Sequence, residues 1–240
     1  MYARKLGLWL ALAVLGLAPA AHAVEDLARE SPRNWVLDVQ LGSYFPSVDE
    51  NVSGTPFADF FGGSSLITQL SLQRYLYEGI GTLGLGLQVG YSEFFGRTFI
   101  SGTDERSGDP MYFRVVPIQL FAAYRFDYAA LHWGIPFVLH GRAGIGEWIW
   151  WESGPGSGSD DSGAKLGLSA SAGLAFHLDW VDPKLAREFD RNFGVNNTYV
   201  FVEYTWWNAK FRGNFFRHGF EARGLDLSDE FVSGGIAFEF

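Results

Sequence analysis

The sequence has no cysteine, few basic residues and only one long run of apolar residues. The lack of cysteine excludes disulfides, thiolate metal sites, a cysteine nucleophile and the lipidated cysteine of a bacterial lipoprotein. Lysine and arginine number 18 against 27 aspartates and glutamates, which gives a formal net charge of −9. An acidic chain of this kind is not a general nucleic-acid binder, so we expect no nucleic-acid partner.

The one long apolar run, Leu6 to Ala18, has the form of a secretory signal peptide. It is too short for a membrane-spanning helix, which needs about 20 apolar residues. Two basic residues precede it, and an A-x-A site that ends at Ala23 follows it. We predict a signal peptide over 1–23, cleaved after Ala23, and a short periplasmic segment over 24–34. Export without disulfides indicates a bacterial envelope protein.

Glycine and aromatic residues are abundant, with 30 Gly, 22 Phe, 10 Tyr and 9 Trp. In the stretch TLGLGLQVGY, from Thr82 to Tyr91, large apolar residues alternate with glycine or glutamine. This alternation places the two kinds of residue on opposite faces of a strand. The same pattern recurs along the chain and gives eight candidate strands, which lie near 35–42, 66–76, 83–92, 116–127, 137–146, 165–177, 200–207 and 232–240.

Several features favour a transmembrane barrel over a soluble sandwich. The segments can be drawn about 10 to 15 residues long, and a tilted membrane crossing needs about 9 to 11. Their polar faces are rich in glycine, alanine and serine, which suits a cramped interior. Only a closed sheet satisfies the backbone of such strands inside a bilayer. We predict an all-β, antiparallel, up-and-down transmembrane β-barrel of eight strands, or of ten if a loop folds back as a hairpin.

Aromatic residues gather near the ends of the predicted strands. Such clusters are typical of the two interfacial girdles of a membrane barrel, and we interpret them in that way. The clusters are Tyr44 and Phe45, Tyr75 and Tyr77, Tyr112 and Phe113, the segment 124–128, Trp148, Trp150 and Trp151, and Trp206 and Trp207.

The final segment, FVSGGIAFEF, ends on Phe240 and has aromatic or apolar residues at alternating positions. With this strand, the chain after the predicted signal peptide resembles the small outer-membrane β-barrels of Gram-negative bacteria, of the OmpA, OmpX and OmpW kind. The segment GVNNTYVFVEY, residues 194–204, also looks like a signature of that family. In the family the last strand is read by the barrel-assembly machinery, which implies this role for Phe238 and Phe240.

The resemblance also implies a location and a set of partners. We expect a monomer in the outer membrane, in contact with its lipids and with lipopolysaccharide. During biogenesis the barrel-assembly machinery and periplasmic chaperones would bind it. No cofactor is implied.

An even number of strands leaves both chain ends on the periplasmic side. The outer loops are then expected at 46–65, 93–110, 151–163 and 208–230. The last of these interleaves basic and aromatic residues, and it either contacts lipopolysaccharide phosphates or packs its own aromatics as an ordinary loop. The candidate contact residues are Lys210, Arg212, Phe215, Phe216 and Arg217.

Before the seventh predicted strand, one periplasmic connection is long and carries helix signals. Asp182 can cap a helix, Pro183 fits its first turn, and Gly194 can end it. The sequence therefore predicts a short helix over 183–192. Two interpretations stay open: a lid that packs under the barrel floor, and a docking site for a periplasmic partner.

Charged residues at inward positions are the remaining candidates for a site. An eight-stranded barrel is about filled by its side chains, and isolated buried charges are costly, so we predict a structural ion network. His140, His177 and Glu203 could be neighbours, which leaves a metal site or an acid/base group as alternatives. The predicted network consists of Asp38, Arg125, Asp127, His140, Arg142, Lys165, His177, Glu203 and Glu239.

These observations predict a barrel with a filled lumen and a structural or surface-interaction role through its outer loops. A narrow pore for ions or small solutes is an alternative, but Tyr75, Phe121, Phe201 and Trp207 are expected to point inward. A lipid-modifying outer-membrane enzyme is a second alternative, which needs a serine beside a histidine near the outer interface. No H-x-S pair or G-x-S-x-G elbow occurs, so we predict no enzymatic activity.

Overall fold

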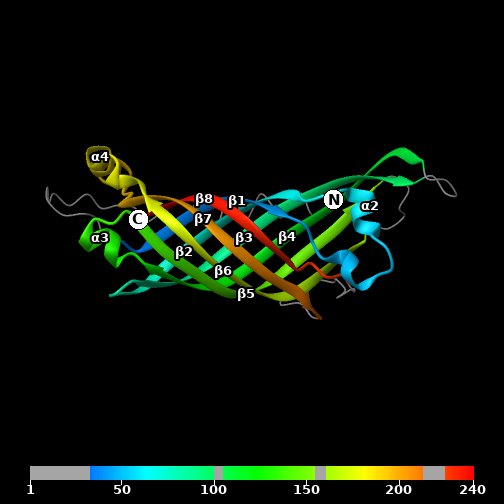
Figure 1. The fold of residues 1–240 in the computed structure, drawn as a ribbon, viewed down its shortest axis with the longest axis horizontal. Coiled ribbons are helices and arrows are strands. Elements are labelled where there is room, and N and C mark those ends of the chain that lie inside the picture. The colour runs from blue at the N-terminus through cyan, green and yellow to red at the C-terminus, as the bar shows by residue number, and fades with distance from the viewer. Residues whose placement is uncertain (1–32, 100–104, 155–160, 213–224) are drawn as a thin grey trace. The chain divides into compact units, whose positions relative to one another are not determined.

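A computed structural model describes residues 33–99, 105–154, 161–212 and 225–240. Eight antiparallel strands follow one another around a closed barrel, and β1 pairs with β8 to close it (Figure 1). This confirms the predicted eight-stranded up-and-down barrel, and the ten-stranded alternative is wrong. The strands are β1 (Trp35–Tyr44), β2 (Ser65–Glu78), β3 (Thr82–Phe99), β4 (Arg106–Phe126), β5 (Phe137–Ser153), β6 (Ser162–His177), β7 (Asn197–Phe211) and β8 (Asp229–Glu239).

The period-two alternation of the sequence becomes an inner and an outer face. In β1, Asp38 and Gln40 are buried in the lumen, whereas Val39 between them is exposed on the outside. Apolar side chains are exposed on the outer face of every strand, and they include Leu41, Leu70, Leu85, Leu87, Leu120, Ile145, Leu174, Val202 and Ile236. A closed ring with an apolar outer wall satisfies its backbone hydrogen bonds within lipid, so the strands form a transmembrane barrel.

Among the described residues, no helix has the length and apolar character to cross a membrane.

The second outer connection is much shorter than predicted. The β3–β4 ladder continues to the pair Phe99–Arg106, so most of the expected loop over 93–110 is strand. The extension is held by polar contacts that alternation does not reveal, because Arg114 donates to Glu93 at 2.5 Å and to Ser153 at 2.8 Å. β4 therefore reaches 21 residues, beyond the 10 to 15 expected.

β1 begins and β8 ends at the same end of the barrel. Because short turns face the periplasm and long loops face outward in such barrels, we call this the periplasmic end and the opposite one the outer end. Figure 1 shows α3 (Tyr128–Trp133) and α4 (Pro183–Phe193) at the periplasmic end and α2 (Pro56–Phe61) at the outer end. Two 3-10 turns, η1 (Val48–Asn51) and η2 (Leu178–Trp180), complete the described connections.

The predicted helix before β7 is confirmed as α4. The Asp182 carboxylate accepts hydrogen bonds from the backbone N–H groups of Lys184 and Leu185, both at 3.1 Å. Gly194 ends the helix with φ of 70°, in the left-handed region that glycine adopts without strain. The interpretation of this helix as a lid under the barrel floor is wrong, because no residue of α4 is buried.

Candidate functional site in the lumen

The lumen holds three layers of side chains. Ion pairs fill the periplasmic end, glutamines fill the middle, and aromatic residues fill the outer end. Each layer draws on strands that are far apart in the sequence, because every strand contributes alternate residues to the interior. The layers decide what can pass through the barrel.

Glu239, near the end of β8, is the centre of the periplasmic layer and is fully buried. Its carboxylate accepts hydrogen bonds from Arg125 at 2.8 Å, from Asn197 at 2.6 Å and from the Tyr75 hydroxyl. Arg125 also donates to the Tyr75 hydroxyl at 3.0 Å, and its guanidinium lies 4.4 Å from the centre of the Tyr199 ring. A buried ion pair is tolerated when its remaining hydrogen-bonding groups are satisfied in this way.

Arg33 joins this layer from just before β1. Its guanidinium lies 3.2 Å from Glu78 and 3.5 Å from Asp127, and Asp127 accepts a further hydrogen bond from Thr82 at 2.7 Å. Arg33 was not predicted to belong to this network, because the alternation that assigns inward positions starts only at the first strand.

A second group of charges belongs to the same layer and lies deeper in the lumen. Arg142 donates to Asp38 at 3.0 Å, and the Ser71 hydroxyl donates to the same carboxylate at 2.5 Å. On its other side, Arg142 Nε lies 3.9 Å from Glu203, whose carboxylate is 3.2 Å from His140 Nε2. Two carboxylates and one guanidinium thus form a compact, buried cluster.

His177 joins the predicted network through Asn197, which also donates to Glu239, and not through His140 and Glu203. It contacts Asn197 at 2.9 Å and Asp179 at 3.4 Å rather than Glu203. The register explains this, because Tyr199 rather than Glu203 stands opposite His177. Across the described part of the chain, no three His, Asp or Glu side chains gather as metal ligands.

Lys165, by contrast, was predicted to join the network but lies apart from the ion pairs. It stands opposite Trp148 in the β5–β6 ladder, toward the outer end. Its charged neighbours there are Arg212 and Asp226. Alternation assigns Lys165 to the interior, but it does not give the depth at which its partners lie.

The middle of the lumen is lined by glutamines. Neighbouring strands place Gln40 opposite Gln69, and Gln88 opposite Gln119. All four are buried, and they line a cavity of about 10 Å³. A second cavity of about 20 Å³ lies among the charged residues. Spaces of this size hold about one water molecule each.

Glycines on the inner face make room for large side chains opposite them. A Cβ added to Gly86 would lie 2.4 Å from the Phe121 ring, and one added to Gly144 would lie 2.4 Å from the Leu120 carbonyl oxygen. Real side chains do not approach so closely, so these positions require glycine. This explains why leucine and glycine alternate in TLGLGLQVGY: the leucines face lipid and the glycines face a filled interior.

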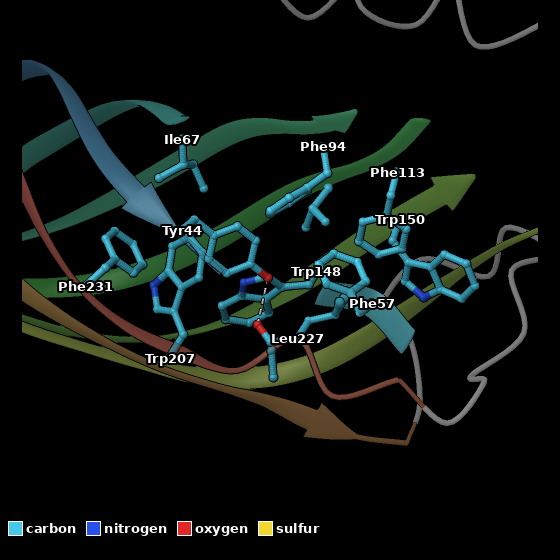
Figure 2. Close-up of a cluster of buried hydrophobic side chains, with 12 residues drawn as sticks. Tyr44, Phe57, Ile67, Phe94, Phe113, Trp148, Trp150, Trp207, Leu227 and Phe231 are labelled. Carbon is cyan, nitrogen blue, oxygen red and sulfur yellow. Dashed lines mark hydrogen bonds between the residues drawn. The ribbon is translucent and has the colours of Figure 1, made fainter. Parts of the chain in front are cut away.

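The outer end is closed by a cluster of buried residues that we call the aromatic plug (Figure 2). Trp207 is near its centre, with ring centroids 5.4 Å from Trp148 and 4.9 Å from Phe231. Its members are Tyr44, Phe57, Ile67, Phe94, Phe113, Val115, Trp148, Trp150, Trp207, Ala209, Leu227 and Phe231. All are less than a tenth exposed.

Helix α2 contributes Phe57 to the plug from the first outer loop. Its ring packs against Phe94 and Phe113 at centroid distances of 5.3 and 5.2 Å. Asp49 of η1 fixes the start of α2, because its carboxylate accepts the N–H groups of Phe57 at 2.8 Å and Ala58 at 2.9 Å. The hydroxyl of Tyr44 donates to the Leu227 carbonyl at 2.9 Å, as the dashed line in Figure 2 shows.

The plug corrects the prediction of two aromatic girdles. Tyr44, Tyr75 and Phe113 point into the lumen, as do Trp148, Trp150 and Trp207. Each stands at an even step from inward polar residues of its own strand, so strand parity rather than position along the strand decides its direction. Tyr77 and Tyr124, by contrast, are exposed on the outside.

The other predicted residues occupy the following places. Phe121 and Phe201 are buried in the lumen. Phe238 lies on the outward face of β8, and Phe240 closes the ring, because its N–H donates to the Trp35 carbonyl at 2.8 Å. Lys210 and Arg212 are exposed at the outer end, while Phe215, Phe216 and Arg217 lie outside the described residues.

Comparisons with known proteins found several solved structures with a similar fold. No family model matches the chain, and neither does any curated protein. The solved structure of Neisserial surface protein A, NspA, is 14% identical with a TM-score of 0.45, over 87% of this chain and 97% of that one. The N-terminal barrel domain of Pseudomonas aeruginosa OprF is 13% identical with a TM-score of 0.41, over 87% and 98%. Ail of Yersinia pestis is 12% identical with a TM-score of 0.39, over 86% and 96%.

Likenesses at this level of identity concern the fold alone. The closed eight-stranded ring and its apolar outer wall rest on the structure itself. The chain is therefore an eight-stranded transmembrane β-barrel, and its fold is similar to those of NspA and the OprF barrel domain.

Proposed function

We propose that this protein is a closed scaffold in the outer membrane, which conducts neither ions nor small solutes and presents its outer loops at the cell surface. The observation that carries this proposal is the aromatic plug, seated by α2 above the glutamine and ion-pair layers. A structural or surface-contact role through the loops follows, because a filled lumen leaves the loops as the accessible part of the molecule.

Two obstacles would face a solute in the lumen. It would have to displace the packed rings around Trp207 at the outer end, and packed interiors do not open without losing many contacts. It would then have to separate Arg125 from Glu239, which would leave two charges buried without partners. Neither obstacle rests on a single residue.

An osmotic swelling assay tests the closed lumen. The refolded protein is placed in phosphatidylcholine vesicles, which are diluted into an isosmotic solution of a small sugar. We expect the vesicles to swell no faster than protein-free vesicles, while vesicles with a general porin swell rapidly. Folding is checked by heat-dependent gel mobility. Swelling well above the protein-free control would overturn the closed scaffold.

For the surface contact, we propose that the outer rim binds phosphate groups of lipopolysaccharide. Three consecutive residues are exposed at the outer end of β7: Lys210, Phe211 and Arg212. An arginine can hold a phosphate through two parallel hydrogen bonds, and a neighbouring lysine adds charge. An exposed aromatic ring beside them can lie against the adjoining acyl chains.

A pair of charge-removing variants tests this contact. Lys210→Ala with Arg212→Ala removes two positive charges at the outer end, and Arg74→Ala removes one from an exposed position near the periplasmic end, outside α4. We expect only the outer variant to bind lipopolysaccharide several-fold more weakly in detergent at low salt. Equal binding by both variants would contradict the surface contact and would leave the closed lumen unaffected.

A further inference from the structure

We propose that α4 and η2 form an interfacial segment that lies on the inner leaflet of the outer membrane, with its apolar face among the lipid acyl chains. α4 is an 11-residue helix with no buried residue. It belongs to the barrel's periplasmic end, beside the start of β7 (Figure 1). No part of the described chain buries the apolar residues of this helix, so their presence needs an explanation.

Those apolar residues lie on one face of the helix. Leu185, Phe189 and Phe193 follow one another at intervals of four residues, which places them in one row. They are 54%, 39% and 69% exposed, and the rings of Phe189 and Phe193 lie 5.3 Å apart. The structure thus leaves a continuous apolar strip open on this helix.

The remaining face is charged, and its three basic residues outnumber the acidic Glu188 and Asp190. Lys184, Arg187 and Arg191 recur at intervals of three and four residues, and all three are exposed. A row of aromatic and leucine side chains opposite a row of lysine and arginine is the pattern of helices that lie in a membrane interface. Their cations interact with anionic lipid phosphates, while the apolar row enters the boundary of the acyl chains.

Aromatic residues of the lipid-facing wall lead from the barrel to η2, which adjoins α4. On that wall, Phe137 of β5 packs against Phe176 of β6 at 5.4 Å between ring centroids. Phe176 in turn contacts Trp180 of η2 at 6.3 Å, and Trp180 is 58% exposed. Tryptophan is typical of the membrane–water interface, so the wall reaches α4 through a residue suited to that depth.

The segment is also held in place. The N–H of Thr198 in β7 donates to the Asp179 carboxylate of η2 at 3.3 Å, and Asp182 caps α4 immediately afterwards. This contact keeps η2 against the barrel. Lipid already covers the adjoining outer wall, so lipid rather than a separate protein is the cover that requires no new partner.

Single-cysteine labelling tests this placement, and the chain's lack of cysteine makes the labels unique. Phe193→Cys puts a nitroxide label on the apolar face, and Arg187→Cys puts one on the charged face as a matched control. Both variants are refolded in vesicles of phosphatidylcholine and phosphatidylglycerol. Paramagnetic relaxation by oxygen, which concentrates in lipid, is then compared with relaxation by a water-soluble nickel chelate.

We expect the label at position 193 to respond mainly to oxygen and the label at position 187 mainly to nickel. If both labels respond mainly to nickel, the helix projects into water and the proposal is wrong. If the label at position 193 is shielded from both agents, the helix packs against protein and the proposal is equally wrong. Heat-dependent gel mobility confirms that each labelled barrel is folded. The result does not depend on whether the lumen conducts.

Discussion

Arg125 and Glu239 form a buried ion pair, 2.8 Å apart, that joins β4 to β8 across the floor of the barrel. They are 114 residues apart in the sequence. No direct ladder links their two strands, which lie on different parts of the ring. The pair therefore ties together opposite parts of a barrel whose strands otherwise bond only to their neighbours.

Glu239→Gln is expected to destabilise the barrel by about 3 to 5 kcal/mol, because it removes the negative charge but leaves Arg125 buried without a counter-charge. The measurement is urea unfolding in lipid vesicles, followed by gel mobility. In vitro refolding needs no assembly machinery, so a change near the C-terminus acts here on stability alone. Glu188→Gln on the exposed α4 serves as the control and should be neutral within about 0.5 kcal/mol. A neutral Glu239→Gln would show that the pair contributes nothing.

A double-mutant cycle tests the second ion pair. Arg142→Met leaves the Asp38 and Glu203 carboxylates buried without their shared cation, so it should lower the free energy of unfolding by about 3 kcal/mol or more. Asp38→Asn leaves Arg142 its contact with Glu203 and should cost less. The double variant removes both charges and should lose less than the sum of the two losses, by at least about 1 kcal/mol. Unfolding of all four proteins under one condition gives the coupling energy. Strict additivity would mean that the two side chains do not interact.

One inward-facing glycine and one outward-facing glycine of β5, Gly144 and Gly141, give a matched pair of variants. Gly144→Ala would bring a Cβ to 2.4 Å from the Leu120 carbonyl oxygen, whereas Gly141→Ala meets nothing closer than 3.4 Å. We expect the first variant to lose about 1 to 3 kcal/mol of stability through overpacking and the second to lose much less. Equal stability of the two variants would contradict the close packing of the lumen. Urea midpoints of the refolded proteins provide the comparison.

The aromatic plug should contribute strongly to stability. Trp207→Ala leaves a cavity between Trp148 and Phe231 and is expected to cost about 3 to 5 kcal/mol. Trp133→Ala, at a position that is 64% exposed, is the matched control and should cost less. Thermal unfolding in detergent measures both. A cost at position 207 no larger than that at position 133 would mean that the plug is loosely packed.

Alternation in the sequence was sufficient to predict the strand number and the two faces, and the capping residues Asp182 and Gly194 were sufficient to predict α4. Leu85 and Gly86 face opposite sides because a strand repeats every two residues, and this holds wherever the strand lies. The cap at Asp182 and the stop at Gly194 are equally local features. Predictions of this kind depend only on near neighbours in the chain, and the structure agrees with them.

Depth and loop structure could not be obtained in this way. His177 does not contact His140 and Glu203 as predicted, because the register places Tyr199 opposite it. That register depends on the stagger of the whole ring. Phe57 enters the plug from α2, a short helix in the first outer loop, where no strand alternation marks the inward residues. Arg33 joins the floor from outside any strand. Each of these residues is placed by contacts between distant segments.

The ion conductance of the refolded protein in a planar lipid bilayer shows whether the lumen is closed. Heat-dependent gel mobility must first show that the barrel is folded. The stacked aromatic plug and the buried ion pairs predict a folded protein that gives no steady current steps. Reproducible single-channel steps from the folded protein would contradict the closed lumen and would show that the barrel is a pore.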